Sequence, residues 1–422
     1  MKINFIARIV SVCLGLAFAV LTVSASEVGT NLPHVFCADP HALAAAKTSL
    51  AAGESKFQPA LHELLIESKR ALAMKPVSVM DKPRVPPSGD KHDFVSQAPY
   101  FWPDTNSPGG HYLHRDGRRN PEADKNSDAG RLGRVCANAR TLALAFYFTS
   151  DEKYAAKAAE IIRVWFLNPA TRMNPNLNYG QGIPGQVDGR PEGLISARGL
   201  VGLMDAIGLL AESKAWTSAD QQGMTAWTEA YFHWLTTNPL ALREGRAANN
   251  HGTFYDTQVV ALALFLGKTD AARELLLKDR ENRITRQIEP DGRQPRELTR
   301  TLSFDYSIFN LRALFNLASL GQNAGVDLWQ YQTPDGRGIL QALKFMAAYA
   351  DPGKPWPYQQ IHPPKRGDLG ELLLRAGGIY PPDELAGAMK FYPASKFISN
   401  QLRLLYPTIQ TAGSDPPPAE KH

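Results

Sequence analysis

The sequence predicts an all-α fold. Apolar residues recur at intervals of three and four over several long stretches, the period of a helix with one buried face. Alternation with a period of two, which would indicate strands, is scarce. Long loops rich in Pro, Gly and Asn separate the helical stretches. Paired antiparallel helices around a central cavity would place such loops at one rim, so the pattern favours an (α/α) toroid. A plain helical bundle or a solenoid is also compatible with the periodicity.

The helical elements follow one another along most of the chain. The clearest apolar stripes begin at Leu132, Tyr154 and Leu200, each with apolar side chains three or four positions apart. Further helical stretches are expected to begin near Lys56, Thr217, Gly252, Thr301, Gly338 and Ala394. The longest loops are expected over residues 80–126 and 168–191. Loops of that length inside a compact domain often carry function.

The N-terminus predicts an export signal over residues 1–25. Lys2 and Arg8 are positively charged, residues 9–23 are apolar, and Ser24-Ala25 ends a small-residue cleavage site. The apolar run is shorter than the about 20 residues of a membrane span, although an uncleaved anchor is the alternative. We expect one domain over residues 26–410 and a disordered tail over 411–422. The mature protein is expected in the periplasm or secreted, without membrane association and as a monomer.

Charge and cysteine content narrow the possible partners. The formal net charge is +5, and removal of Lys2 and Arg8 with the signal leaves +3 (5 − 2). This mild excess fits an acidic ligand, and no concentrated basic run or motif indicates nucleic-acid binding. Outside the signal segment, Cys37 and Cys136 could form a disulfide in an oxidising compartment or remain buried thiols.

A polar tripeptide, Asn249-Asn250-His251, stands at a predicted loop-to-helix junction, because residues 252–265 have a helical pattern. Asparagine oxygens accept hydrogen bonds from free N–H groups at helix starts, so capping is the alternative role for both asparagines. For His251 the alternative is a hydrogen-bonded structural histidine.

Arg300 and Tyr306 form a second polar pair. Residues six positions apart on a helix are offset by about 120°, so they do not share a face if both are helical. Arg300 must then project from the preceding turn to meet Tyr306 in one cleft. The alternatives are a surface ion pair with Glu297 for Arg300 and a half-buried core phenol for Tyr306.

Together, the two groups supply amide, imidazole, guanidinium and phenol, a set that suits elimination in an acidic polysaccharide. The C5 proton of a uronic acid becomes removable when the adjacent carboxylate is neutralised, because the carbanion charge can then spread. A phenol near a cation has a lowered pKa and can serve as base, acid or both. We therefore predict Asn250, His251, Arg300 and Tyr306 as catalytic residues and an acidic polysaccharide as the partner.

Aromatic and polar loop residues are candidates for binding the sugar chain, since aromatic faces stack on sugar rings and arginine binds carboxylates bidentately. The residues predicted for this role are Tyr100, Trp102, Arg115, Asn178, Tyr179, Gln181, Asn249 and Tyr358. The alternatives are an aromatic plug that packs the loops and simple turn formation. His111 and His114 are three positions apart, but no third ligand is evident, so we expect neither a metal site nor a cofactor.

These residues resemble the alginate lyase superfamily of polysaccharide lyases. The resemblance extends from about residue 94 to about residue 345 and is carried by residues 100–104, 154 with 165–167, 173–176, 249–251 and 297–306. It implies an (α/α) toroid that cleaves a β-1,4-linked polyuronate, in the first place alginate, by metal-independent β-elimination. The product would carry a 4,5-unsaturated uronate end.

The resemblance also implies roles for single residues. Asn250, with Arg300 and His251, would neutralise the uronate carboxylate, and Tyr306 would protonate the glycosidic oxygen. Tyr306 would also take the C5 proton of mannuronate, whereas His251 or a second tyrosine would take that of guluronate.

Three other functions remain to be weighed against alginate cleavage. The spacing between Arg300 and Tyr306 looks closer to a branch that also cleaves glucuronate polymers. A glycoside hydrolase on the same toroid needs two carboxylates across the bond, and the sequence shows no recognisable pair. The third alternative is a polysaccharide-binding protein without catalysis.

Overall fold

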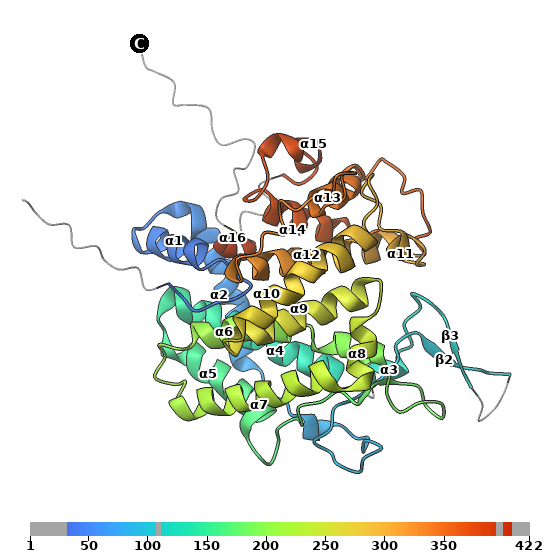
Figure 1. Cartoon of the computed structure of the whole chain (residues 1–422). Coiled ribbons are helices and arrows are strands. Elements are labelled where there is room, and N and C mark those ends of the chain that lie inside the picture. Colours follow the sequence, from blue (N-terminus) through green and yellow to red (C-terminus); the bar gives the residue numbers. More distant parts are fainter. Residues whose placement is uncertain (1–31, 107–110, 126, 394–399, 407–422) are drawn as a thin grey trace, which may run out of the picture. The chain divides into compact units, whose positions relative to one another are not determined.

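The computed structural model describes residues 32–106, 111–125, 127–393 and 400–406. Over these residues the protein is mostly helical, as the sequence predicts (Figure 1). The predicted signal over residues 1–25, the tail over 411–422 and the start of the stretch expected from Ala394 lie outside the described residues. Among the described helices, none has the combined length and apolarity that a membrane span requires.

Long helices supply the frame. They are α1 (Pro40–Ala51), α2 (Gln58–Ala73), α4 (Ala129–Thr149), α5 (Glu152–Ile162), α6 (Leu200–Leu209), α7 (Ser218–Thr237), α9 (Asn250–Phe265), α10 (Thr269–Asp279), α12 (Ser303–Asn323), α13 (Ile339–Ala347) and α14 (Arg366–Ala376). Shorter α-helices are α3 (Glu122–Lys125), α8 (Pro239–Gly245), α11 (Pro295–Leu298), α15 (Ala386–Met389) and α16 (Leu402–Leu405). The 3₁₀-helices are η1 (Ser55–Phe57), η2 (Val79–Asp81), η4 (Pro191–Ala197) and η6 (Pro382–Glu384), and η3 (Arg163–Leu167) and η5 (Arg280–Thr285) are π-helical.

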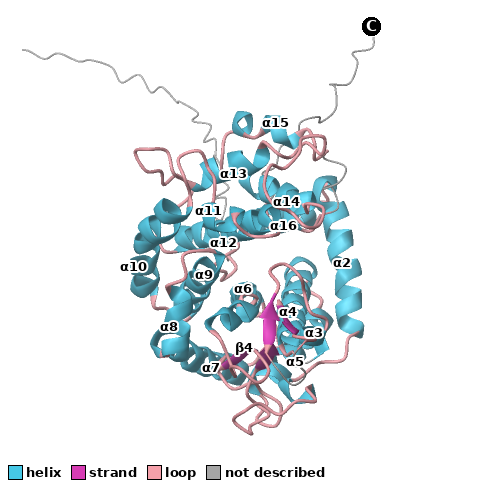
Figure 2. Cartoon of the chain, turned by 90° about the vertical axis from the view of Figure 1, so that its right-hand side faces the viewer, coloured by secondary structure: helices cyan, strands magenta, loops and turns pink. Residues whose placement is uncertain are grey.

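Helix α9 is the centre of the packing. It is buried along almost its whole length and contacts α6, α7, α8, α10 and α12 (Figures 1 and 2). On the other side, α4 packs against α2, α5 and α6. Only two residues join α4 to α5, and Ser150 adopts a left-handed conformation there with φ 56°. Such a short connection makes consecutive helices run back along each other, as the toroid requires.

Two small sheets lie within the long loops. Strand β1 (Val95–Gln97) pairs in parallel with β4 (Tyr179–Gly182), and β2 (Phe101–Pro103) pairs antiparallel with β3 (Tyr112–His114). The sequence indicated only loops here. Strands of three or four residues are too short to show a period of two, so their pairing was not predictable from alternation.

Asp205 of α6 fastens the N-terminal segment to the helices. Its carboxylate accepts hydrogen bonds from the backbone N–H groups of Phe36, Cys37 and Ala38, at 2.6, 2.9 and 2.8 Å. Cys37 and Cys136 are both free thiols, so they do not form the disulfide that was one of the two alternatives. Burial raises the pKa of each thiol to about 12, so neither is an activated nucleophile.

Replacing Asp205 tests this anchor. Asp205→Ala is expected to lower the free energy of unfolding by roughly 2–4 kcal/mol, because an unsatisfied buried donor costs about 1–3 kcal/mol. Urea unfolding monitored by circular dichroism measures the change. Asp39 caps the exposed start of α1, so Asp39→Ala serves as control and should cost about 1 kcal/mol. Equal losses in the two variants would contradict the anchor.

Candidate active site

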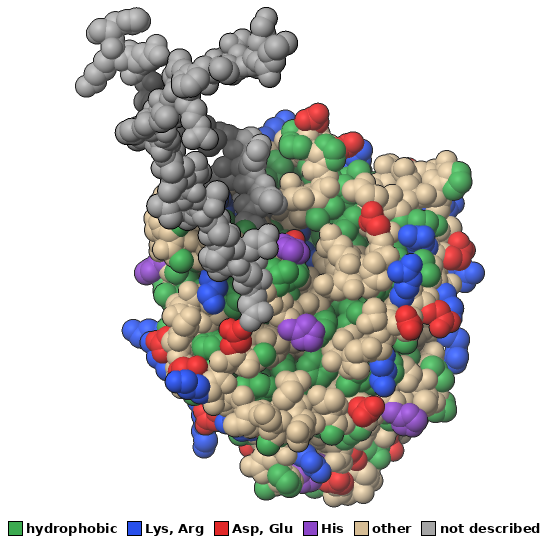
Figure 3. Space-filling view, turned by 60° about the vertical axis from the view of Figure 1, so that its left-hand side comes forward, with side chains coloured by type: hydrophobic (Ala, Val, Ile, Leu, Met, Phe, Trp, Pro, Cys, Tyr) green, Lys and Arg blue, Asp and Glu red, His purple; other side chains and the backbone are tan. Residues whose placement is uncertain are grey.

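A cavity of about 1170 Å³ opens between α4, α6, α9 and α12 and the loops that carry the small sheets. Its lining is rich in cations. The basic residues are Arg119, Arg140, Arg190, Arg198, Arg300, Arg312 and Lys365, and the acidic ones are Asp116, Glu192, Asp305 and Asp368. Seven cations against four carboxylates leave a formal excess of three. On the face drawn in Figure 3, by contrast, basic and acidic side chains are interspersed. The cavity is therefore suited to an anionic ligand.

The cavity gathers most of the residues predicted from the sequence. Those that line it are Tyr100, Gln181, Asn249, Asn250, His251, Arg300 and Tyr306. The predicted residues that do not line it are Trp102, Arg115, Asn178, Tyr179 and Tyr358. All four predicted catalytic residues are thus brought together, although they come from segments about fifty residues apart.

Local packing explains why some predicted residues lie elsewhere. Side chains alternate along β2, so Phe101 faces the cavity while the Trp102 indole donates to the Arg118 carbonyl at 2.8 Å. Asn178 accepts a hydrogen bond from the indole of Trp234 at 2.9 Å. These side chains hold loops in place, which was the alternative role.

Arg115 and Tyr358 also pack outside the cavity. The Arg115 guanidinium lies 5.6 Å from the ring centre of Trp102, and the ring of Tyr358 lies 5.1 Å from that of Trp356. Tyr179 belongs to β4, next to Gln181, which does line the cavity. Gln181 is held at φ 49°, a left-handed conformation that non-glycine residues rarely adopt, and its N–H donates to Ser96.

The first two residues of the tripeptide have structural partners. Asn249 caps α9, and its side chain accepts from the His251 N–H at 3.3 Å. Asn250 is fully buried, and its backbone N–H and Nδ2 donate to the carboxylate of Glu297 at 2.7 and 2.8 Å. One amide hydrogen of Asn250 is therefore already used, while its Oδ1 has no described hydrogen-bond partner.

His251 forms a hydrogen-bonded pair with a buried carboxylate. Its Nδ1 lies 2.6 Å from Oε1 of Glu244, which is 2 % exposed at the end of α8. Burial raises the pKa of Glu244, and the bond to His251 opposes that rise. In the tautomer whose Nδ1 donates to Glu244, the imidazole carries its electron pair on Nε2, the arrangement of a general base.

The contact of Glu244 with His251 was not predicted from the sequence. Glu244 precedes His251 by seven residues and belongs to a different helix, so neither spacing nor motif connects the two. The sequence shows only that an acidic residue precedes a candidate base. The turn between α8 and α9 is what brings the two side chains together.

Arg283 holds that turn. Its guanidinium donates to the carbonyls of Gly245 and Ala247 at 2.6 and 2.8 Å and pairs with the buried carboxylate of Asp256. A side chain at Gly252 would collide with the Arg283 guanidinium and the Ala247 carbonyl. The glycine after His251 therefore permits the close approach that fixes the tripeptide.

Arg300 contacts Tyr306 from outside the helix that carries Tyr306, as predicted. Helix α12 begins at Ser303, so Arg300 projects from the preceding turn, and its Cζ lies 3.6 Å from the ring centre of Tyr306. Its Nε and Nη2 donate to Asp116 at 3.1 and 2.6 Å. The ion pair is with Asp116 and not with Glu297, and it already balances the charge of Arg300.

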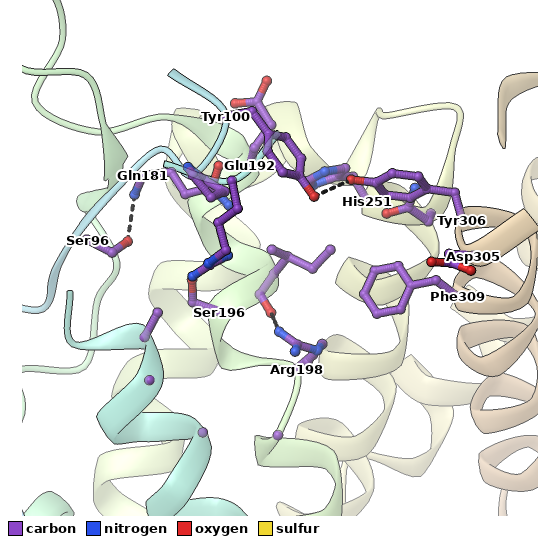
Figure 4. Close-up of a pocket in the computed structure, with 18 of the residues that line it drawn as sticks. Ser96, Tyr100, Gln181, Glu192, Ser196, Arg198, His251, Asp305, Tyr306 and Phe309 are labelled. Atoms are coloured by element: carbon purple, nitrogen blue, oxygen red, sulfur yellow. Dashed lines mark hydrogen bonds between the residues drawn. The ribbon is translucent and has the colours of Figure 1, made fainter. Parts of the chain in front are cut away.

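Tyr306 is a half-buried phenol whose hydroxyl lies 2.7 Å from that of Tyr100 (Figure 4). Burial raises the pKa of Tyr306 well above its usual range, and Tyr100 adds to the rise. Arg300 opposes the shift without reversing it. The expected lowering of this pKa is therefore wrong, because desolvation outweighs the adjacent cation. In the free protein Tyr306 holds its proton, which suits a general acid.

Asp116 latches the loop with Tyr100 to the start of α12. It accepts from Arg300 and, at 2.9 Å, from both the N–H and the hydroxyl of Thr301. Burial alone would raise the pKa of Asp116, but these hydrogen bonds lower it to about 2. Gly117 adopts φ 70° beside the latch, where a side chain would collide with Thr301.

Known proteins resemble the chain over most of its length. Residues 78–356 match the family described as alginate lyase. The crystal structure of an alginate lyase from Bacteroides ovatus is 40% identical, covers 89% of this chain and 99% of the other, and superposes with a TM-score of 0.82. Alginate lyase A1-III from Sphingomonas species A1, 18% identical with a TM-score of 0.54 and coverage of 83% and 91%, has the same fold. No curated protein matches the chain.

These matches define the class of the protein, a polysaccharide lyase built on an (α/α) toroid, and confirm the predicted fold. The chain belongs to the alginate lyase family.

The role of Glu244 is testable by removing its charge. Glu244→Gln is expected to lower kcat roughly 100-fold with little change in KM, because a neutral amide can donate as well as accept, so it neither fixes the tautomer of His251 nor stabilises the imidazolium that forms. Steady-state kinetics on a polyuronate measure both constants. Glu229→Gln, on the exposed face of α7, is the matched control. An unchanged kcat in Glu244→Gln would contradict the positioning role.

The latch at Asp116 predicts a pH dependence of stability. The folded pKa of about 2 lies below the about 3.9 of an unfolded aspartate. The latch therefore contributes stability that is fully present above about pH 5 and is lost as pH falls through 2. The difference in unfolding free energy between wild type and Asp116→Asn should stay constant from neutral pH to about 5 and shrink below about 4. Urea unfolding at a series of pH values measures it, and a difference that persists undiminished at pH 2 would disprove the latch.

Proposed function

We propose that the protein cleaves alginate by β-elimination in this cavity, with His251 as base and Tyr306 as acid. The observation that carries the proposal is the pairing of a carboxylate-bound imidazole and a protonated phenol in one cation-lined cavity. Membership of the alginate lyase family supports the substrate. The protein is proposed to act outside the cytoplasm, in the periplasm or after secretion, as a monomer.

The reaction follows from the protonation states. Nε2 of His251 takes the C5 proton of a uronate whose carboxylate is balanced by the cations of the cavity. The electron pair of the C5–H bond forms the C4=C5 double bond, and the C4–O bond breaks. The leaving oxygen receives the proton of Tyr306, and the hydroxyl of Tyr100 is placed to reprotonate it. No step in this sequence requires a metal.

The four carboxylates that a hydrolase could use, Asp128, Glu192, Asp256 and Asp305, have other partners, and Asp305 accepts from the backbone N–H of Lys365 at 3.0 Å. Asp128 and Asp256 are buried in ion pairs with Lys82 and Arg283. Glu192 lines the cavity, but a bond to Arg190 helps to lower its pKa despite burial, so it does not hold a proton for a leaving group. The chemistry of the cavity thus favours elimination.

The choice of base has a consequence for the preferred uronate. With His251 as base, the protein should cleave polyguluronate and release products that absorb ultraviolet light. Digestion of polymannuronate, polyguluronate and glucuronan, each with and without a chelator, tests this. Activity confined to polymannuronate would transfer the role of base to Tyr306. Reducing ends without ultraviolet absorbance would indicate a hydrolase.

Loss of the phenol hydroxyl tests the general acid. Tyr306→Phe is expected to lower kcat about 10²- to 10⁴-fold, because the leaving oxygen no longer receives a proton. Binding of an oligouronate, measured by calorimetry, should change little. Tyr331→Phe, outside the cavity, is the control. Retention of most activity in Tyr306→Phe would show that another group is the acid.

A further inference from the structure

The arginines of the cavity fall into two groups. Those with a carboxylate partner are Arg119 with Asp124, Arg190 with Glu192, Arg300 with Asp116, and Arg312 with Asp368 and Glu371. Arg140 and Arg198 form no ion pair with any described residue. Arg140 still lies near the buried carboxylate of Asp205, which leaves Arg198 as the cation of greater interest.

Arg198 is held by its surroundings without being neutralised. It directly follows η4, its Nη1 donates to the Ile195 carbonyl at 3.0 Å, and its Cζ lies 5.7 Å from the ring centre of Phe309. A guanidinium has five N–H donors, and the others have no acceptor among the described residues. An anion arriving here would find several donors already in position.

The environment of Arg198 favours an incoming negative charge. The side chain is exposed to the cavity although protein surrounds it on most sides. Burial lowers the pKa of Arg198, and the neighbouring cations Arg312 and Arg119 lower it further. A guanidinium stays charged in spite of such shifts, so a bound anion would relieve the repulsion between these cations.

Arg198 is separate from the groups that perform the chemistry. In Figure 4 it lies across the cavity from the hydroxyl groups of Tyr100 and Tyr306. The cavity lining is also open along α4, since a side-chain carbon added to Gly130 or Gly133 would meet no atom within 4 Å. The volume of about 1170 Å³ exceeds the roughly 300–1,000 Å³ of a drug-sized ligand site, so more than one sugar ring fits.

Gln97 provides a second, independent sign of a ligand in the same cavity. Its side chain is only 3 % exposed, lines the cavity, and has no described partner for either Nε2 or Oε1. Buried amides are normally hydrogen-bonded, because an unmade bond is costly. A donor and an acceptor side by side match the hydroxyl groups of a sugar.

We propose that Arg198 binds the carboxylate of a second uronate, one or more residues away from the linkage being cleaved, with Gln97 bonding sugar hydroxyl groups of the same chain. The inference rests on the proposed lyase function and adds to it a site for a non-reacting sugar. The enzyme would then recognise a run of carboxylates rather than a single uronate.

The length of the substrate tests the proposal. Arg198→Gln should lower kcat/KM for a tetrauronate about 10- to 100-fold, the effect of losing a hydrogen bond to a charged group, and leave a cleavable diuronate nearly unaffected. Arg286→Gln is the matched control, because Arg286 lies outside the cavity and is paired with Glu281 on the surface. Equal losses on both lengths, or none on the tetramer, would overturn the site.

Binding measurements on an inactive variant distinguish the proposed Arg198 site from the lyase reaction. Calorimetry compares Tyr306→Phe with the double variant Tyr306→Phe/Arg198→Gln. The double variant should bind the tetrauronate about 10- to 100-fold more weakly than Tyr306→Phe does, and the two should bind a neutral tetrasaccharide equally. Unchanged affinity for the tetrauronate would refute the role of Arg198. Binding that depends on Arg198 in a protein that forms no unsaturated product would refute the lyase function and leave the site standing.

Discussion

The desolvation of the Tyr306 phenol, which lies against Tyr100 and Arg300, is the constraint on which the site depends. Desolvation raises the pKa of the phenol even with a guanidinium against its ring, so the residue has a proton to give at the start of the reaction. In the proposed reaction the base is therefore a different group, His251, whose Nδ1 lies against Glu244. One burial effect therefore separates acid from base.

The same arrangement changes how the substrate charge is balanced. Arg300 is occupied by Asp116, and one amide hydrogen of Asn250 is occupied by Glu297. Both residues therefore stabilise the structure of the site, and neither offers all of its donors to a substrate carboxylate. The positive charge available to a polyuronate comes from the wider lining, of which Arg198 is an unneutralised part. Catalysis and recognition of the chain are thus assigned to different sides of one cavity.

Sequence reasoning predicted the features that depend on neighbours in the chain. The helical frame, the capped start of α9 at Asn249 and the projection of Arg300 from the turn before α12 all follow from local periodicity and helix geometry. The four residues to which the family resemblance gave roles, Asn250, His251, Arg300 and Tyr306, all line the cavity. Loop residues such as Trp102 were misplaced because the face of a three-residue strand is not readable from its sequence.

What the sequence could not predict are contacts between distant segments. The bond between Asp116 and Arg300 spans 184 residues, and that between Tyr100 and Tyr306 spans 206. The pKa of Tyr306 depends on how deeply it is buried, which no pattern of residues reveals. Unpaired groups such as those of Arg198 and Gln97 are recognised only when every possible partner among the described residues has been placed.

The assignment of His251 as base and Tyr306 as acid is tested most directly by a crystal structure of Tyr306→Phe with a bound oligouronate. One linkage should place its C5 at Nε2 of His251 and its glycosidic oxygen where the missing hydroxyl would be. A sugar chain whose C5 points away from His251 would contradict the account.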